Sequence, residues 1–301
     1  KPATVAGAIV VAYLLIHFRN WRCPACRAPL PARPGTSCRR CGAPFRSDAS
    51  GRQAAPSPEP APPQPVTAKA AKAAAPARKV AASPPKPKKP LTPVEHWAVA
   101  ASANLTITWA REFDALALPN GQEKAREVLG RQWNVLGPDD ARQTFDWLRH
   151  EGHSAEFENI LHALQQVPAD KIEGFVAAQD RHIRRAVLFV AEHGSELKDG
   201  TLTAWDTVRL SFMARATFTA GWVNETTAWD VVLEAARKLQ RSYGSWAELS
   251  QNFLLGRGFW GEASPESMES FRKNADWLLT HERSPWTQLP WDLPLTTKLL
   301  N

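Results

Sequence analysis

Hydrophobic and polar residues beyond position 94 recur at helical spacing along most of the chain. Alternating runs bounded by turn residues, which would indicate strands, are hard to find there. Helical periodicity or capping residues mark segments near 94–116, 122–135, 138–150, 154–166, 169–193, 202–220, 225–242, 245–256 and 265–282. The pattern predicts one all-α domain over residues 94–301, with an irregular tail at 285–291 that packs two tryptophan rings across the helices.

The segment 202–220 has one apolar face. At 100° per residue, that face carries Trp205, Arg209, Phe212, Met213, Ala216 and Ala220. We therefore expect the helix to be buried on that side. Gly221 supplies the left-handed residue that commonly ends a helix, and Asn224 can accept a backbone N–H at the start of the next one. This punctuation predicts an antiparallel hairpin of the helices 202–220 and 225–242.

A third helix is expected to follow the hairpin. Ser245 and Glu248 have the S-x-x-E spacing of a capping box, which marks a helix start. Apolar residues keep helical spacing from there to Leu254. Gly256 and Gly258 are expected to end the helix.

Five short motifs follow one another in this region. They are Ala204-Trp205-Asp206, Ala220-Gly221-Trp222, Ala228-Trp229, Ser245-Trp246, and Asn252-Phe253-Leu254-Leu255-Gly256-Arg257 followed by Phe259-Trp260. In order and spacing they resemble the signature of the bacterial domain-of-unknown-function family numbered 1266, over roughly residues 94–301. Similar proteins have an aromatic-rich run where this chain has Ala216-Thr217-Phe218-Thr219. The resemblance supports the fold and implies no activity.

Charge divides the chain into two unlike parts. Residues 1–93 contain 16 Lys and Arg against 2 Asp and Glu, a net of +14, whereas residues 94–301 contain 21 against 28, a net of −7. Proteins bind duplex nucleic acid largely through cations that face phosphates. The acidic helical domain is therefore not expected to bind nucleic acid.

The first twenty residues favour a transmembrane anchor. Residues 3–18 carry no charge and are followed by Arg19, Trp21 and Arg22. A helix of that length spans about 24 Å, slightly less than a hydrocarbon core of about 30 Å. The arginines predict a single pass through the bacterial inner membrane, with the rest of the chain in the cytoplasm. The alternatives are a buried soluble helix and a signal peptide, although no A-x-A cleavage site follows the run.

All four cysteines lie in two C-x-x-C pairs, Cys23 with Cys26 and Cys38 with Cys41, eleven residues apart. Four thiolates in two close pairs satisfy the tetrahedral coordination of Zn²⁺. The spacing predicts a structural zinc ribbon over residues 21–45. Two disulfides are the alternative, but they need an oxidising compartment, which the predicted cytoplasmic location does not provide.

The ribbon is basic, and its arginines are Arg22, Arg27, Arg33, Arg39 and Arg40. Their position beside the predicted anchor favours lipid headgroups or a structural use. Contacts with protein or nucleic acid are the alternatives, although aromatic stacking residues are nearly absent.

Residues 46–93 are rich in Pro, Ala, Ser and Lys and lack the apolar residues that a folded core needs. We expect a disordered linker with polyproline character. Its lysines could contact anionic lipid or the acidic domain, or the segment could be a solvated spacer.

Arg209 lies within the apolar stripe at 202–220 and Asp206 lies one turn earlier, which predicts a partly buried ion pair and makes both residues candidates for a site. Asp206 and Arg209, with Arg215, Glu225 or Arg257 nearby, could form a polar cleft that binds a ligand or activates water. The structural alternative makes Asp206 the partner of a Thr203 cap and Arg209 a buried fork that joins helices. We favour the structural alternative.

The run His150-Glu151-Gly152-His153 lacks the H-E-x-x-H spacing of a zinc protease. Gly152 is expected to end a helix before His153, so a capping or supporting role is favoured.

The sequence as a whole predicts a membrane-anchored, cytoplasm-facing interaction or regulatory protein with an acidic, tryptophan-rich surface for a protein partner. It contains no phosphate-binding glycine loop and no G-x-S-x-G motif. The alternatives are an enzyme of unknown specificity that uses Asp206, Arg209 and Arg257, and a nucleic-acid sensor that works through the ribbon.

Overall fold

A computed structural model describes residues 90–197, 201–261 and 265–295. The predicted anchor, the zinc ribbon and almost all of the linker lie outside these ranges. Within them every regular element is helical, which confirms the all-α class. No helix in this part of the chain combines the length and apolar character needed to cross a membrane.

The α-helices are α2 (Pro93–Ala100), α3 (Ala103–Thr106), α4 (Gly121–Val128), α5 (Pro138–His150), α6 (Ser154–Gln165), α7 (Ile172–Ala177), α8 (Arg181–His193), α9 (Thr203–Thr219), α10 (Glu225–Ser242), α11 (Trp246–Trp260), α12 (Pro265–Thr280) and α13 (Pro285–Gln288). A π-helix, η1 (Leu129–Trp133), extends α4, and two short 3₁₀ helices are η2 (Ala169–Lys171) and η3 (Gly194–Glu196).

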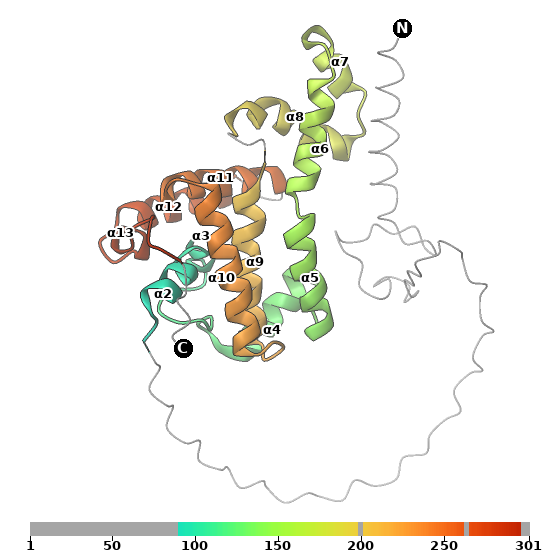
Figure 1. The fold of residues 1–301 in the computed structure, drawn as a ribbon. Coiled ribbons are helices and arrows are strands. Elements are labelled where there is room, and N and C mark those ends of the chain that lie inside the picture. The colour runs from blue at the N-terminus through green and yellow to red at the C-terminus, as the bar shows by residue number, and fades with distance from the viewer. Residues whose placement is uncertain (1–89, 198–200, 262–264, 296–301) are drawn as a thin grey trace, which may run out of the picture.

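Helix α9 is the central element of the domain (Figure 1), with α10, α11, α5 and α4 packed around it. Every residue from Ala204 to Thr217 is buried. The expected burial of the apolar face is therefore confirmed, and the other faces are buried as well, because neighbouring helices surround α9. The charged residues Asp206, Arg209 and Arg215 are therefore buried together with the rest of α9.

The predicted hairpin of α9 and α10 is confirmed. Gly221 is left-handed, with φ of 76°, and the Trp222 amide donates to Thr217 O at 2.9 Å, which closes the last turn of α9. The Asn224 side chain accepts from the Thr227 amide at 2.8 Å and starts α10. The tight turn places the two helices side by side (Figure 1).

Helix α11 begins where the sequence predicts but ends later. Ser245 Oγ accepts from the Glu248 amide at 3.1 Å, whereas the Glu248 carboxylate accepts from the Gly244 amide, one residue before the expected partner. The helix then continues through Gly256 and Gly258 to Trp260. The prediction that these glycines end the helix is therefore wrong.

Gly256 and Gly258 lie within α11 because side chains of other helices pack closely against them. A Cβ on Gly256 would overlap the Trp205 side chain, and a Cβ on Gly258 would lie 3.0 Å from the Phe189 ring. Both glycines let neighbouring helices approach the backbone of α11. The left-handed residue that ends the helix is Gly261, with φ of 79°.

The predicted helix 94–116 is broken. It is replaced by α2, α3 and an irregular segment up to residue 120. At the break, Ser102 Oγ donates to Val99 O at 3.0 Å and Thr106 Oγ1 donates to Ser102 O at 3.2 Å. Such side-chain bonds compete with the helical backbone pattern.

The predicted helix 169–193 is also broken, into η2, α7 and α8. The backbone leaves the helix at Asp180, where ψ is 146°. Arg184 Nη2 donates to Ala177 O at 2.7 Å and to Gln179 O at 3.1 Å, and these bonds hold the connection between α7 and α8. Helices α6, α7 and α8 form a lobe that projects from the bundle (Figure 1).

The C-terminal segment packs as predicted but is partly helical, because α13 covers 285–288. Trp286 stacks on Trp246 with 5.2 Å between centroids, and Trp291 contacts Trp246 at 4.8 Å and Trp97 at 5.2 Å. Trp97, Trp246 and Trp286 are buried in the core, and Trp291 packs against it. Trp260, at 38% exposure, is the only exposed tryptophan of the described part, so the predicted tryptophan-rich surface is not present there.

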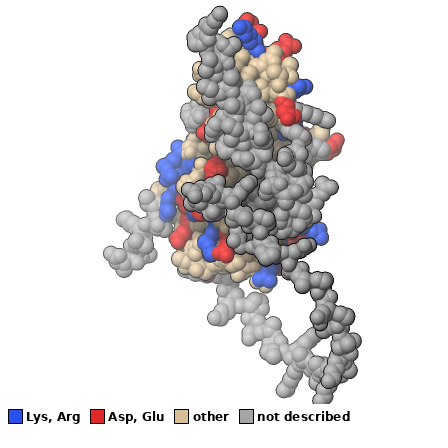
Figure 2. Space-filling view, turned by 90° about the vertical axis from the view of Figure 1, so that its right-hand side faces the viewer, with Lys and Arg blue, Asp and Glu red and all other residues tan. Residues whose placement is uncertain are grey.

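The face drawn in Figure 2 carries charged side chains of both signs. Figure 2 shows basic and acidic side chains interspersed over the parts of that face that the structure describes.

Candidate functional site

Asp206 joins two distant parts of the fold. Its Oδ1 accepts from the His153 amide at 3.0 Å, and its Oδ2 accepts from the Ser154 amide at 2.8 Å and from Ser154 Oγ at 2.7 Å. A side chain of α9 therefore satisfies amides at the N-terminus of α6. The hypothesis that Asp206 supports a Thr203 cap is wrong, because Leu202 is the N-cap of α9 and no side chain caps there.

Gly152 makes this contact possible. Its φ is 58°, and a Cβ at this position would overlap the Asp206 carboxylate. The prediction that Gly152 follows the end of a helix is confirmed, since α5 ends at His150. His150 is exposed, whereas His153 is 8% exposed, and the two histidines belong to different segments.

Arg209 lies next to Asp206 and His153. Its Nη1 donates to His153 Nδ1 at 2.9 Å and to Asp206 Oδ1 at 3.3 Å. Because arginine only donates, His153 Nδ1 accepts, so this imidazole is neutral. Burial, with help from Arg209, lowers the pKa of His153.

The charges of this group support one another. Burial opposes ionisation of Asp206, but the hydrogen bond from the His153 amide and the charge of the Arg209 guanidinium favour it, and the pKa of this carboxyl lies below its usual value. Burial lowers the pKa of Arg209 to about 10, which still leaves the side chain charged at neutral pH. The predicted ion pair between Asp206 and Arg209 is therefore present and buried.

Three indoles surround the Arg209 guanidinium. Its Cζ lies 4.7 Å from the centroid of Trp133, 4.8 Å from Trp205 and 5.6 Å from Trp147. Trp133 comes from η1, Trp147 from α5 and Trp205 from α9. Cation–π contacts of this kind stabilise a desolvated arginine. The sequence marked Trp205 but not the other two, because no local spacing relates them to Arg209.

Arg209 and Arg257 line one cavity of about 330 Å³, which we call the arginine–indole cavity. Its remaining lining residues are Leu105, Thr108, Trp109, Gln132, Trp133, Trp205, Phe212, Trp260 and Phe271. The Arg257 Cζ lies 4.9 Å from the Trp260 centroid and 5.1 Å from Phe271, and its Nη2 donates to Ser267 Oγ at 3.3 Å.

The other predicted members of the cleft lie elsewhere. Asp206 lines a separate cavity of about 150 Å³, and Glu225 is exposed at the start of α10. Arg215 is fully buried and donates to Leu116 O, Ala115 O and Ser102 Oγ at 3.0–3.1 Å. Burial lowers its pKa to about 9. Arg215 thus holds the irregular segment before α4.

The enzyme hypothesis requires the Asp206 carboxylate to be free to remove a proton from a substrate or a water molecule. The carboxylate is 3% exposed and accepts from His153, Ser154 and Arg209. A general base must reach the proton that it removes. Asp206 would have to break the cap of α6 to do so.

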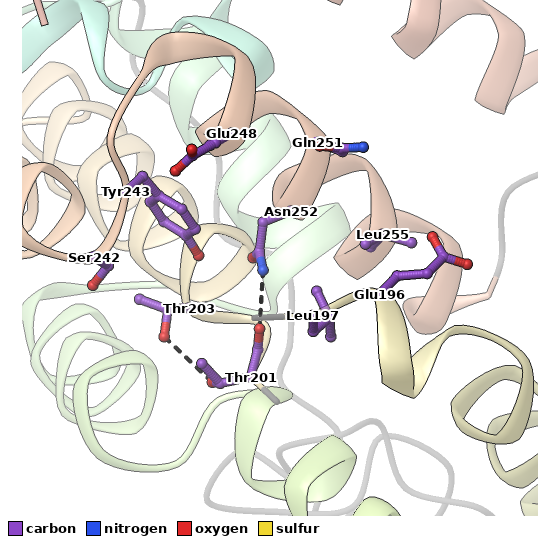
Figure 3. A pocket seen from close by; sticks show the side chains of 10 residues that line it. All are labelled: Glu196, Leu197, Thr201, Thr203, Ser242, Tyr243, Glu248, Gln251, Asn252 and Leu255. Atoms are coloured by element: carbon purple, nitrogen blue, oxygen red, sulfur yellow. Dashed lines mark hydrogen bonds between the residues drawn. The ribbon is translucent and has the colours of Figure 1, made fainter. Parts of the chain in front are cut away.

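A second hollow lies at the start of α9 (Figure 3) and measures about 240 Å³. The Ala204 amide donates to Tyr243 Oη at 2.9 Å and to Asn252 Oδ1 at 3.1 Å, and Asn252 Nδ2 donates to Thr201 O at 2.9 Å. The polar side chains that enter this hollow therefore support the N-terminus of α9.

A broad groove of about 800 Å³ runs along the projecting lobe, and we call it the lobe groove. Its lining is Glu158, Leu161, His162, Leu164, Gln165, Ile172, Val190, Ala191, Gly194, Ser195 and Leu197. Apolar side chains of α6, α7 and α8 thus form most of its floor. Leu188 of α8 is also 50% exposed on this lobe.

Metal ligands are not grouped in the described part of the chain, where no three His, Cys, Asp or Glu side chains could hold one ion. The four cysteines lie outside that part.

Comparison with protein families gives one match. The model described as "Protein of unknown function (DUF1266)" matches residues 128–291, from the end of α4 to the C-terminal tail. The matched range includes both arginines of the arginine–indole cavity. It is narrower than the 94–301 expected from the sequence motifs.

Two curated proteins of Escherichia coli (strain K12) are similar to this chain. The uncharacterized protein YbeR is 23% identical over 138 residues, which is 46% of this chain and 58% of the relative. The uncharacterized protein YbeU is 22% identical over 145 residues, 48% of this chain and 62% of the relative. The chain thus spans about three fifths of the length of each. No solved structure matches.

Proposed function

The chain belongs to the DUF1266 family of proteins of unknown function, and on that premise we propose that it is a membrane-tethered regulatory protein whose helical domain recognises a protein partner. The lobe groove is the observation that carries this proposal. The groove is concave, largely apolar and on a lobe that projects from the bundle (Figure 1).

The chemistry of the groove fits an amphipathic helix of the partner. Leu161 and Leu164 come from α6, Ile172 from α7 and Val190 from α8, so the apolar floor extends along neighbouring helices. Such a floor is the usual receptor for the apolar face of a helix. Glu158, an exposed residue of the lining, favours a partner helix with a basic flank.

The N-terminal part supplies the tether in this proposal. Residues 3–18 anchor the chain in the bacterial inner membrane, and Cys23, Cys26, Cys38 and Cys41 hold a structural Zn²⁺ in the cytoplasm. Residues 46–93 link the ribbon to the helical domain. The tether keeps the lobe groove near the membrane while leaving the domain free to meet its partner.

Site-specific crosslinking in cells tests partner recognition. A photoreactive amino acid at His162 or Gln165, both of which line the groove, should crosslink to one discrete partner. Ala191→Arg should abolish that crosslink, because a long charged side chain then enters the groove from an exposed position. Ala178→Arg is the matched control, since Ala178 is exposed on the same lobe outside the groove.

Two crosslinking results would contradict recognition of a partner through the lobe groove. An adduct that survives Ala191→Arg, or that also forms from a photoreactive residue at Arg272 on α12, would show that the groove is not the recognition surface.

A further inference from the structure

Two guanidinium groups share the arginine–indole cavity. Arg209 and Arg257 both line it, and the described lining contains no carboxylate. Arg257 contributes to lowering the pKa of Arg209, after the larger effect of burial, so the two cations lie close enough to repel each other. An anion in this cavity would interact favourably with both guanidinium groups.

Arg209 is positioned to bind an anion without losing its protein contacts. Only Nη1 is engaged, by Asp206 and His153, and no described residue accepts from Nε or Nη2. The side chain is 8% exposed, so its place is fixed by packing. A guanidinium carries five N–H donors, and the unused edge can donate to two oxygens of one anionic group.

The walls of the cavity are flat and aromatic. Trp109, Trp133, Trp205 and Trp260 line it together with Phe212 and Phe271. The rings of Trp205 and Trp260 are 6.1 Å apart, and those of Trp133 and Phe212 are 6.2 Å apart. Aromatic walls favour a ligand with a planar ring, because stacked and edge-to-face contacts add to its burial. A volume of about 330 Å³ suits one small molecule.

We propose that the arginine–indole cavity is a binding site for a small organic anion with a planar ring, whose carboxylate or phosphate lies between Arg209 and Arg257. The ring stacks against the indoles, and Trp260, the exposed tryptophan, lies at the mouth. Gln132 and Thr108 are exposed polar residues of the lining and can bond to polar groups on the ring. This site goes beyond partner recognition by the lobe groove and does not depend on it.

Calorimetric titration of the full chain in lipid nanodiscs tests the proposal. The probes are two matched pairs, anthranilate with its uncharged amide and guanosine 5′-monophosphate with guanosine. At least one anion should bind with one site per chain and about tenfold or more tighter than its neutral partner, since bonds to charged groups are the stronger ones. The pair that shows this difference identifies the anionic group as carboxylate or phosphate.

Substitutions locate the site. Arg257→Gln should weaken binding of the anion about tenfold or more and leave binding of its neutral partner unchanged. Arg257 is partly exposed, so the variant should fold, which its circular dichroism will show. Arg272→Gln is the control, because Arg272 is an exposed arginine of α12 outside the cavity lining.

Three results would overturn the inference. They are the absence of binding by both anions at millimolar concentration, equal affinity for the anion and its neutral partner in both pairs, and equal effects of the substitutions at Arg257 and Arg272. None of these results bears on the crosslink from the lobe groove, so the two proposals fail separately.

Discussion

The Asp206 carboxylate accepts hydrogen bonds from groups of two helices, α6 and α9. It accepts from two amides at the start of α6, from Ser154 Oγ and from Arg209 of its own helix. An asparagine at this position keeps the size of the side chain but has one acceptor oxygen and no charge. The buried guanidinium of Arg209 would then lack its carboxylate partner.

We expect Asp206→Asn to lower the free energy of unfolding by about 3 kcal/mol, because breaking a buried ion pair leaves an uncompensated charge. Urea unfolding of the full chain, followed by tryptophan fluorescence, measures this change. Asp230→Asn, at an exposed position of α10, should change stability by less than about 0.5 kcal/mol. Equal stability of the two variants would contradict the assignment of Asp206 as a buried cap.

The pH dependence has a defined sign. The pKa of Asp206 is lower in the fold than its ordinary value of 3.8. Its contribution is therefore complete at neutral pH and is lost as the pH falls from about 4 through the lowered value.

The sequence identifies single residues of the candidate site but not the distant residues that contact them in the fold. Asp206 and Arg209 stand three positions apart within an apolar stripe, which predicts their ion pair. His153 is 53 positions before Asp206, and the arrangement of α5, α6 and α9 brings the two together. The same holds for Trp133 and Arg257, which share the cavity only because η1 and α11 both pack against α9.

Among the helices, the close approach of α9 and α11 at Gly256 gives a sharp test. Gly256→Ala should destabilise the protein by about 1–3 kcal/mol, because the added methyl group overlaps the Trp205 side chain. Gly174→Ala is the control, since a Cβ on this exposed residue of α7 meets nothing within 4 Å. The control should be stabilising by about 0.5–1 kcal/mol, as alanine favours the helix.

Thermal unfolding of the full chain, monitored by circular dichroism, distinguishes the two glycines. If both variants unfold at the same temperature, the contact between Trp205 and Gly256 does not constrain the packing of α9 against α11. Displacement of Trp205 would also alter the arginine–indole cavity, which that ring lines.

Helix boundaries were predictable where a capping residue sets them and not where distant contacts do. Gly221, Asn224 and Ser245 mark their boundaries through local bonds. The helical periodicity of the sequence continues through Asp180, although the helix breaks there. Gly256 has the appearance of a helix end in the sequence, and only its contact with Trp205 explains why α11 continues through it. Composition and periodicity thus predicted the all-α class but not the lengths of α7, α8 and α11.

For the whole molecule, the uncharged run at residues 3–18 leads to a test of the predicted membrane anchor. We expect the full chain to stay in the membrane fraction after an alkaline wash, and Val11→Arg to release it. An arginine at the centre of a span costs about 2.5–3.5 kcal/mol, and residues 3–18 form only a short span.

Val66→Arg, the same substitution within the linker, should leave the protein in the membrane fraction. Metal analysis of that fraction should find one zinc per chain, as four cysteine thiolates predict. Release of the unsubstituted chain by the wash would refute the anchor, and intact disulfides without metal would refute the ribbon.

The buried position of Arg215 has a consequence for synthesis of the chain. Its partners Ser102, Ala115 and Leu116 precede it by 99–113 positions. At about 5–20 residues per second, roughly 100 residues take about 5–20 s to translate. Ser102, Ala115 and Leu116 therefore leave the ribosome well before the Arg215 side chain that donates to them, and this N-terminal edge of the domain reaches its final state only after α9 has been made.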